Sequence, residues 1–119
     1  MIEVYLTNLA REKSGLISTD KEIKITVLGH AGYSDKNGDV VCAGVSAIIQ
    51  TAIIAINKVA KIKQKIKQKK GYLESTISVN KLEKNVLNNL LIIISTMLVG
   101  LEEIIKINPD ALKIYIEKE

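Results

Sequence analysis

The sequence is poor in the residues that most often carry special chemistry. Its 119 residues include no tryptophan or phenylalanine, one proline, one histidine and one cysteine. A single cysteine, Cys42, excludes an internal disulfide and with it a disulfide-stabilised secreted scaffold. One histidine, His30, and one cysteine cannot supply the three or four nitrogen and sulfur ligands of a zinc site. We therefore expect neither a metal nor a cofactor.

Signals for export or membrane insertion are also missing. Residues 1–6 alternate in polarity and have neither a basic region nor an apolar signal core. The eighteen uncharged residues from Val40 to Asn57 reach the lower length of a membrane span. Their apolar residues, however, recur with the spacing of a helix that buries one face. We expect a cytoplasmic protein with no membrane partner.

The basic charge is concentrated in one segment. The chain has 17 basic and 13 acidic residues, and the seven lysines between Lys58 and Lys70 have no acidic residue among them. Without them the balance is 10 − 13 = −3. The alternating lysines would share one face of a strand; they are Lys61, Lys63, Lys65 and Lys67. Such a face is either simply solvated or a contact for RNA phosphates, although the stacking aromatics common in RNA-binding proteins are few.

The hydrophobic periodicity predicts one domain spanning residues 1–119. We expect strands at residues 2–7, 23–28, 61–69, 72–79 and 112–116, and helices from 40–42 to 58 and from 81 to 106. Turns are expected around residues 12–15 and at Lys70-Gly71, and the first two strands are expected to form a hairpin. The fold class is therefore α/β, of the α+β type, in the order ββαββαβ. Two helices would pack on a mixed, mostly antiparallel sheet.

The only histidine and the only cysteine lie where they could act together. His30 ends a predicted strand, and Cys42 lies twelve residues later in the first turn of a predicted helix. A helix N-terminus beside an imidazolium lowers the pKa of a thiol, and the thiolate is a nucleophile. His30 would then act as general base and acid. The backbone N–H groups of Cys42, Ala43 and Gly44 would face a developing oxyanion.

Other residues near this pair allow more than one interpretation. Asp39 either orients His30 or caps the helix, and Ser46, one turn beyond Cys42, either supports the site or bonds to the helix backbone. Turn-forming residues between the pair predict a mobile loop, which includes Gly32, Tyr33, Asn37 and Gly38. Cys42 could also be an ordinary core residue or the thiol of a redox sensor.

The stretch from Gly29 to Ser46 closely resembles the signature of the ribosomal-processing cysteine protease family, Prp. That signature has a Gly-His-Ala opening, a glycine-bearing loop, then Asp, two aliphatic residues, Cys, small residues, Val and Ser. The twelve-residue spacing from His30 to Cys42 agrees with it. One departure is Asn37 where a loop glycine is expected, with the glycine falling at Gly38.

The resemblance implies a cytoplasmic, homodimeric cysteine endopeptidase. Its substrate would be the N-terminal extension of a bacterial large-subunit ribosomal protein, the one numbered twenty-seven. His30 and Cys42 match the catalytic dyad of the family, and Asp39 and Ser46 match supporting positions. A homodimer is also favoured by the two long apolar helices. The alternative function is a non-catalytic module that binds the ribosome or RNA through the lysine-rich strand.

Overall fold

A computed structural model of the chain describes residues 1–29 and 36–118, with the backbone alone for residues 36–39. The strands are β1 (Ile2–Thr7), β2 (Leu9–Glu12), β3 (Gly15–Ser18), β4 (Glu22–Leu28), β5 (Lys65–Lys69), β6 (Tyr72–Ser78) and β7 (Leu112–Glu117). The helices are α1 (Lys36–Lys58) and α2 (Lys84–Ile107).

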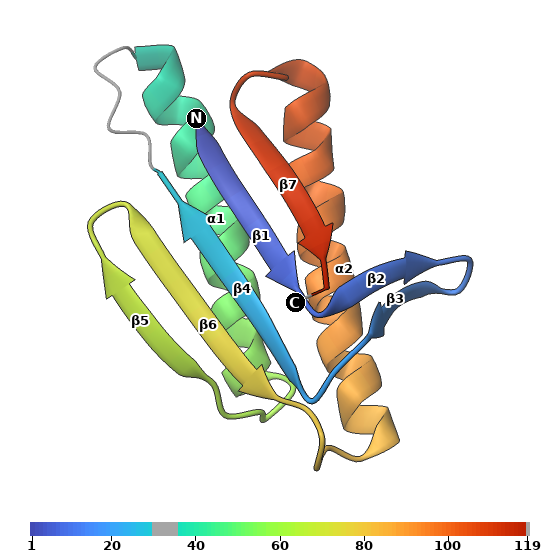
Figure 1. The fold of residues 1–119 in the computed structure, drawn as a ribbon. Coiled ribbons are helices and arrows are strands. Elements are labelled where there is room, and N and C mark those ends of the chain that lie inside the picture. The colour runs from blue at the N-terminus through green and yellow to red at the C-terminus, as the bar shows by residue number, and fades with distance from the viewer. Residues whose placement is uncertain (30–35, 119) are drawn as a thin grey trace.

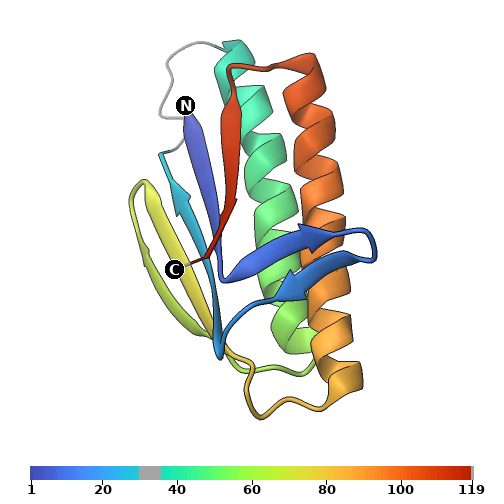
Figure 2. The ribbon, with the colours of Figure 1, turned by 45° about the vertical axis from the view of Figure 1, so that its right-hand side comes forward.

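Five strands form one sheet in the order β5-β6-β4-β1-β7 (Figure 1). Strand β1 pairs antiparallel with β4 and parallel with β7, and the pairs β4–β6 and β5–β6 are antiparallel. Both helices cover the same face of this sheet, and the other face is open (Figure 2). The expected fold class is confirmed, because the elements of this main sheet follow one another as ββαββαβ.

The hairpin formed by β2 and β3 is an addition that the periodicity did not predict. It is a separate two-stranded sheet around the turn expected near residues 12–15. Asn8 directs the chain into it, because this residue has a left-handed φ of 66° and its buried side chain donates a hydrogen bond to the carbonyl of Glu22. β1 and β4 therefore pair as expected, with a second hairpin inserted between them.

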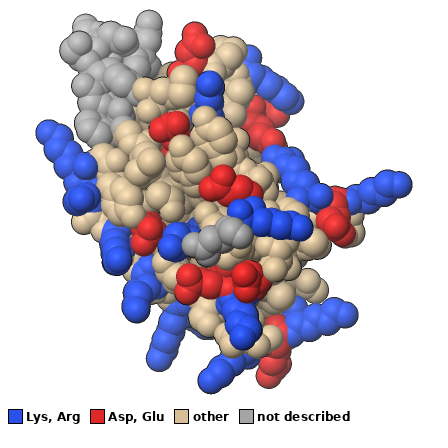
Figure 3. All heavy atoms as spheres, in the orientation of Figure 1, with Lys and Arg blue, Asp and Glu red and all other residues tan. Residues whose placement is uncertain are grey.

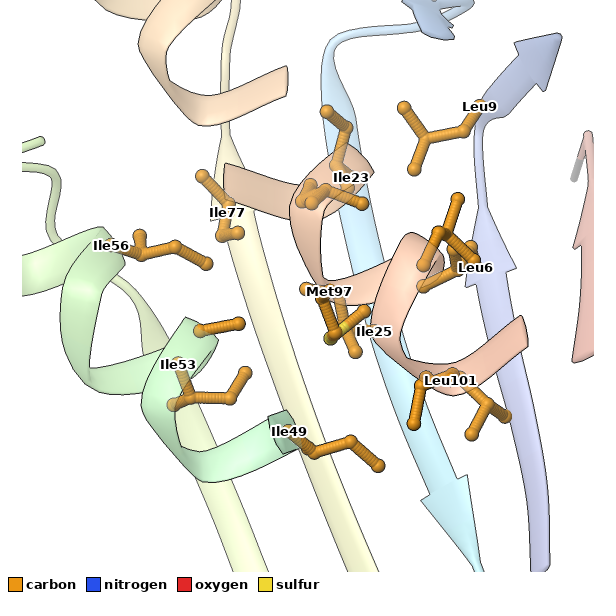
Figure 4. Close-up of a cluster of buried hydrophobic side chains, with 14 of the residues drawn as sticks. Leu6, Leu9, Ile23, Ile25, Ile49, Ile53, Ile56, Ile77, Met97 and Leu101 are labelled. Atoms are coloured by element: carbon orange, nitrogen blue, oxygen red, sulfur yellow. The ribbon is translucent and has the colours of Figure 1, made fainter. Parts of the chain in front are cut away.

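The core lies between the helices and the covered face of the sheet. Alternate strand residues point into it, and each helix contributes residues at helical spacing. Figure 4 shows where the two sets meet, with Ile49, Ile53 and Ile56 from α1, Met97 and Leu101 from α2, and Leu6, Leu9, Ile23, Ile25 and Ile77 from the strands. This packing holds α1 across the sheet, and α1 carries the cysteine.

Helix α1 is also long and apolar enough to cross a membrane, by length and composition. Its segment Val40–Lys58 has a mean hydropathy of 2.0, and 33% of that segment is buried inside the protein. The buried residues recur at the spacing of one helical face and pack on the sheet; they are Cys42, Val45, Ile49, Ala52, Ile53 and Ile56. The apolar periodicity in this segment thus corresponds to a face packed on the core.

The predicted strand over residues 61–69 is too long, because β5 begins only at Lys65. Lys61 has a left-handed φ of 59°, which is not a strand conformation. Ile62 is buried, with only 4% of its surface exposed. The amide of Gln64 donates hydrogen bonds to the carbonyl of Ile53 at 2.6 Å and to Asn57 Oδ1 at 3.1 Å, which ties this segment to α1. Gln64 Oε1 accepts a hydrogen bond from the buried hydroxyl of Ser75 in β6 at 2.6 Å. These bonds replace strand pairing in this segment.

Candidate active site

A pocket of about 410 Å³ lies between the first half of α1, the end of β4 and the turn joining β5 to β6. This volume falls within the range of small-ligand and side-chain pockets. Polar groups enter it from α1 and from the β5–β6 hairpin. The residues lining it are Ile2, Val27, Gly29, Cys42, Ala43, Val45, Ser46, Ile49, Gln50, Gln68, Lys69, Gly71, Tyr72 and Leu73.

Cys42 reaches this pocket from the inner side of α1. Its side chain is 7% exposed and belongs to the core cluster, so the sulfur is sheltered from bulk water while it borders the cavity. A thiol that is both sheltered and next to a cavity can meet a bound substrate with little competing water. The sequence allowed Cys42 to be either a core residue or a reactive thiol. At this position it can be both buried and reactive.

The expected start of the helix at residues 40–42 is wrong, because α1 begins at Lys36. Cys42 is therefore in the second turn, and the N–H groups of Cys42, Ala43 and Gly44 point at the carbonyls four residues earlier, as in any α-helix. Only the first four N–H groups of a helix lack such a partner. Binding of an oxyanion by these three amides would require the first turn to open, and that role stays a prediction.

The other predicted residues of this region are only partly described. The first turn of α1 contains Asn37, Gly38 and Asp39, of which only the backbone is described. Asp39 therefore lies inside the helix, and the expectation that it caps the helix from the preceding position is wrong. His30 lies outside the described residues, as do Gly32 and Tyr33. Of the four residues named for the predicted mobile loop, Asn37 and Gly38 thus belong to the start of α1.

Gly29, the residue before His30, fixes where the chain leaves β4. Its N–H donates a hydrogen bond to the carbonyl of Gly71 at 3.0 Å, and both glycines line the pocket. Its φ is 81°, and a Cβ atom here would lie 2.5 Å from the carbonyl oxygen of Met1. Glycine is required on both counts. The strand end that leads to His30 is thereby held at the same pocket as Cys42.

Ser46 and Gln50 continue the line of Cys42 along α1. The three residues are spaced by four, so they follow one another along one side of the helix, and all three line the pocket. Gln50 Nε2 donates a hydrogen bond to Ser46 Oγ at 3.2 Å. Ser46 is therefore bonded to a neighbouring side chain within the site. Gln50 was missed from sequence, although its spacing of eight from Cys42 was a usable signal.

The opposite wall, at the end of the β5–β6 hairpin, was also missed. Lys69 Nζ lies 5.6 Å from the centre of the Tyr72 ring, and Tyr72 donates a hydrogen bond to Glu74 Oε2 at 2.7 Å. This bond, together with desolvation and the negative charge of Glu74, raises the pKa of Tyr72 above its usual value. The sequence predicted the turn at Lys70-Gly71 and the strand that follows it, but not their approach to α1, which depends on the pairing of β6 with β4.

Among the described residues, no three histidine, cysteine, aspartate or glutamate side chains are grouped so that they could hold a metal ion. The chemistry that the described pocket offers is that of a sheltered thiol with hydroxyl, amide, phenol and ammonium groups around it. This set suits a nucleophilic attack on a carbonyl carbon better than ligation of a cation.

Comparison with known proteins connects this site to a protein family. The sequence model of a family described as cysteine protease Prp matches residues 10–113. No curated protein matches significantly. A crystal structure of an essential ribosomal processing protease Prp from S. aureus, in complex with a substrate peptide, is similar to this chain. It has a TM-score of 0.71 and 24% identity, over 98% of this chain and 99% of that chain.

Two further crystal structures share the fold. The S. aureus protease in complex with a covalently linked product peptide has a TM-score of 0.70 and 24% identity, over 98% of this chain and 99% of that chain. SMU.848 from Streptococcus mutans has a TM-score of 0.67 and 20% identity, over 100% of this chain and 96% of that chain. The family match extends over most of the chain, and the site contains the expected thiol. The chain therefore belongs to the cysteine protease Prp family and is a cysteine protease.

Proposed function

We propose that this protease uses Cys42 and His30 as a catalytic dyad. Its substrate would be the N-terminal extension of the bacterial large-subunit ribosomal protein numbered twenty-seven. The observation that carries the dyad is the shared pocket. Cys42 lines this pocket, and so does Gly29, which follows β4 and directly precedes His30. The substrate class is supported by the similar S. aureus structure, which is called a ribosomal processing protease.

The proposed reaction has two steps. His30 accepts the thiol proton, and the sulfur of Cys42 attacks the scissile carbonyl carbon to form a tetrahedral intermediate. This collapses to a thioester while the leaving amine takes the proton from His30. A water molecule, deprotonated by His30, then attacks the thioester, so that the cleaved N-terminal peptide leaves as an acid and the thiol is restored.

We also propose that the protein is a cytoplasmic homodimer that associates through the outer face of its two helices. A groove of about 440 Å³ runs between α1 and α2, lined by small and apolar residues that include Ile48, Ile92 and Met97. The exposed fractions of Ile54, Ile92 and Val99 are 50%, 62% and 61%. An apolar surface of this kind on both helices favours a second copy as its partner.

A peptide spanning the N-terminal junction of the ribosomal protein tests the proposed function. The wild-type protein is expected to cut it, and Cys42→Ala and His30→Ala are expected to leave it intact while keeping the circular dichroism of the wild type. Because Cys42 is the only cysteine, an electrophilic analogue of the peptide should add to one site per chain, as seen by mass spectrometry. Lys58→Ala, a change at the exposed end of α1 outside both the pocket and the groove, serves as the control. Cleavage by Cys42→Ala would refute the proposal.

The non-catalytic alternative loses its support, because the family is one of proteases. The lysine-rich segment on which it was based is a separate feature of the surface, and the catalytic proposal does not use it.

A further inference from the structure

The lysine edge, defined as Lys61, Lys63, Lys65, Lys67, Lys69 and Lys70, is the most strongly charged surface that catalysis leaves unexplained. All six side chains are exposed, and none forms an ion pair with another residue in the described part of the chain. Lysine side chains extend from this edge of the sheet in Figure 3. The charge is therefore available to a partner.

The sheet gives these lysines a regular arrangement. Strand β5 is at the edge of the sheet and pairs with β6 in a register that sets Lys65 opposite Thr76, Lys67 opposite Glu74 and Lys69 opposite Tyr72. Lysines two residues apart along a strand share one face and are separated by about 6.7 Å. A row of ammonium groups thus follows the open face, with Ile66 and Gln68 turned to the other side.

The start of the row is held in place by Gln64. This residue bonds to Ile53 and Asn57 in α1 and to Ser75 in β6, and the neighbouring Ile62 is buried. The lysine edge therefore stands on a fixed backbone. A fixed row loses less conformational entropy on binding than a flexible basic tail would.

Protection of the sheet edge against aggregation also favours lysine, but it does not account for this number. Strand β7, at the other edge, has Lys113 and Glu117 with Tyr115 between them, a mixed set. The rest of the molecule is acidic, since removal of the seven lysines from Lys58 to Lys70 leaves a charge of −3. One edge is therefore basic on a protein that elsewhere repels anions.

We infer that the lysine edge binds the phosphate backbone of RNA. The edge leads to the active site, because Gln68 and Lys69 at the end of β5 line the pocket that contains Cys42. RNA held along the edge would place the pocket beside a protein bound to that RNA. The choice of RNA over an acidic polypeptide rests on the proposed function, since a ribosomal protein is a substrate that associates with RNA. Few aromatic residues are near the edge, so binding is expected to be insensitive to sequence.

The test measures binding of a labelled polyuridine oligonucleotide by fluorescence anisotropy over a range of potassium chloride concentrations. Lys63→Gln, Lys65→Gln and Lys67→Gln are combined in one variant that leaves Lys69 and the pocket unchanged. Each lost phosphate contact reduces the slope of log affinity against log salt by about 0.7, so the slope is expected to fall by about two. The matched control combines Lys13→Gln, Lys81→Gln and Lys84→Gln, exposed lysines elsewhere, with the same loss of net charge.

The control is expected to keep the wild-type slope, and equal losses in both variants would overturn the inference. Stronger binding of polyglutamate than of polyuridine at equal charge would assign the edge to an acidic protein and overturn it too. Cleavage of the free junction peptide should be the same in the edge variant and the wild type. Loss of RNA binding with intact peptide cleavage separates this inference from the proposed function. Failure of peptide cleavage in the wild type refutes the proposed function and leaves the RNA result to be judged by itself.

Discussion

Gln50 donates its side-chain amide to the hydroxyl oxygen of Ser46 at 3.2 Å, one helical turn beyond Cys42 in the same pocket. This pair orders a hydroxyl near the thiol without bonding it to the helix backbone, so its hydrogen remains able to reach a substrate. Both residues are otherwise exposed. Their bond is therefore expected to affect catalysis more than folding.

Replacement of Gln50 by alanine is expected to lower kcat/KM for the junction peptide about fivefold, which corresponds to one hydrogen bond of about 1 kcal/mol. Ser46→Ala should cause a similar loss, and the double variant should lose little more than either alone, because the two residues act as one unit. Thermal unfolding should be unchanged in all three. Additive losses in kcat/KM would contradict a shared role.

Gly29→Ala is expected to destabilise the protein by more than 2 kcal/mol, roughly the sum of left-handed strain and a backbone clash. The added Cβ would lie 2.5 Å from the carbonyl oxygen of Met1. Gly15→Ala is the matched control, since Gly15 also has a positive φ, of 118°, but no atom lies within 4 Å of its Cβ position. Urea unfolding of both variants measures the difference, and an equal cost would show that the clash is relieved.

Gln64→Ala is expected to lower the free energy of unfolding by about 1–3 kcal/mol, because the buried hydroxyl of Ser75 loses its partner. The double variant Gln64→Ala/Ser75→Ala should recover part of this loss, since no buried hydroxyl is then left without a bond. Urea denaturation of the wild type, the two single variants and the double variant measures the free energy of unfolding. A double variant less stable than both single variants would contradict this account of the bond.

Glu74→Gln is expected to bring the pKa of Tyr72 down toward its ordinary value. The hydrogen bond to the Glu74 carboxylate is the main cause of the raised pKa. A raised phenol pKa means that the stabilising contribution is fully present below the pKa of the unfolded chain, near 10, and is lost as pH rises through the higher folded value. Difference absorption of tyrosinate in Glu74→Gln and Tyr72→Phe, titrated at alkaline pH, separates Tyr72 from the other tyrosines.

Ile92→Asp is expected to shift the protein from dimer to monomer in sedimentation at micromolar concentration. A carboxylate in an apolar interface is strongly unfavourable, whereas Ile92 is 62% exposed in the single chain, so folding should tolerate the change. Ile66→Asp, at the sheet edge and 43% exposed, is the control and should remain dimeric. A wild-type protein that is monomeric under these conditions would remove the proposal of a dimer.

Sequence reasoning succeeded where local periodicity decides the structure. The alternation at Ile2, Val4 and Leu6 predicted β1, and the spacing from Val45 to Ile56 predicted the core face of α1. It failed where tertiary contacts override local pattern. Residues 61–64 alternate lysine with isoleucine or glutamine as a strand would, yet Gln64 bonds to α1 and β5 begins only at Lys65.

The candidate site was also predicted only where local sequence decides the position of a residue. The position of Cys42 followed from its spacing and from the family signature, and the structure places it in a pocket with Ser46. The far wall could not be foreseen, because Tyr72 and Lys69 approach α1 only through the order of strands in the sheet. The start of α1 was missed because Asn37 and Gly38 are weak helix formers, so the pattern favoured a loop.

The parallel pairing of β1 with β7 has a consequence for how the chain acquires its structure. The register sets Ile2 beside Leu112, so this contact closes a loop of 110 residues, whereas β5 and β6 meet across a two-residue turn. Closing a long loop has a large entropic cost before any hydrogen bond forms, and such contacts slow folding. Docking of β7 is therefore expected to be a late event. Until it occurs, one side of β1, and with it Ile2 at the floor of the pocket, has no neighbouring strand.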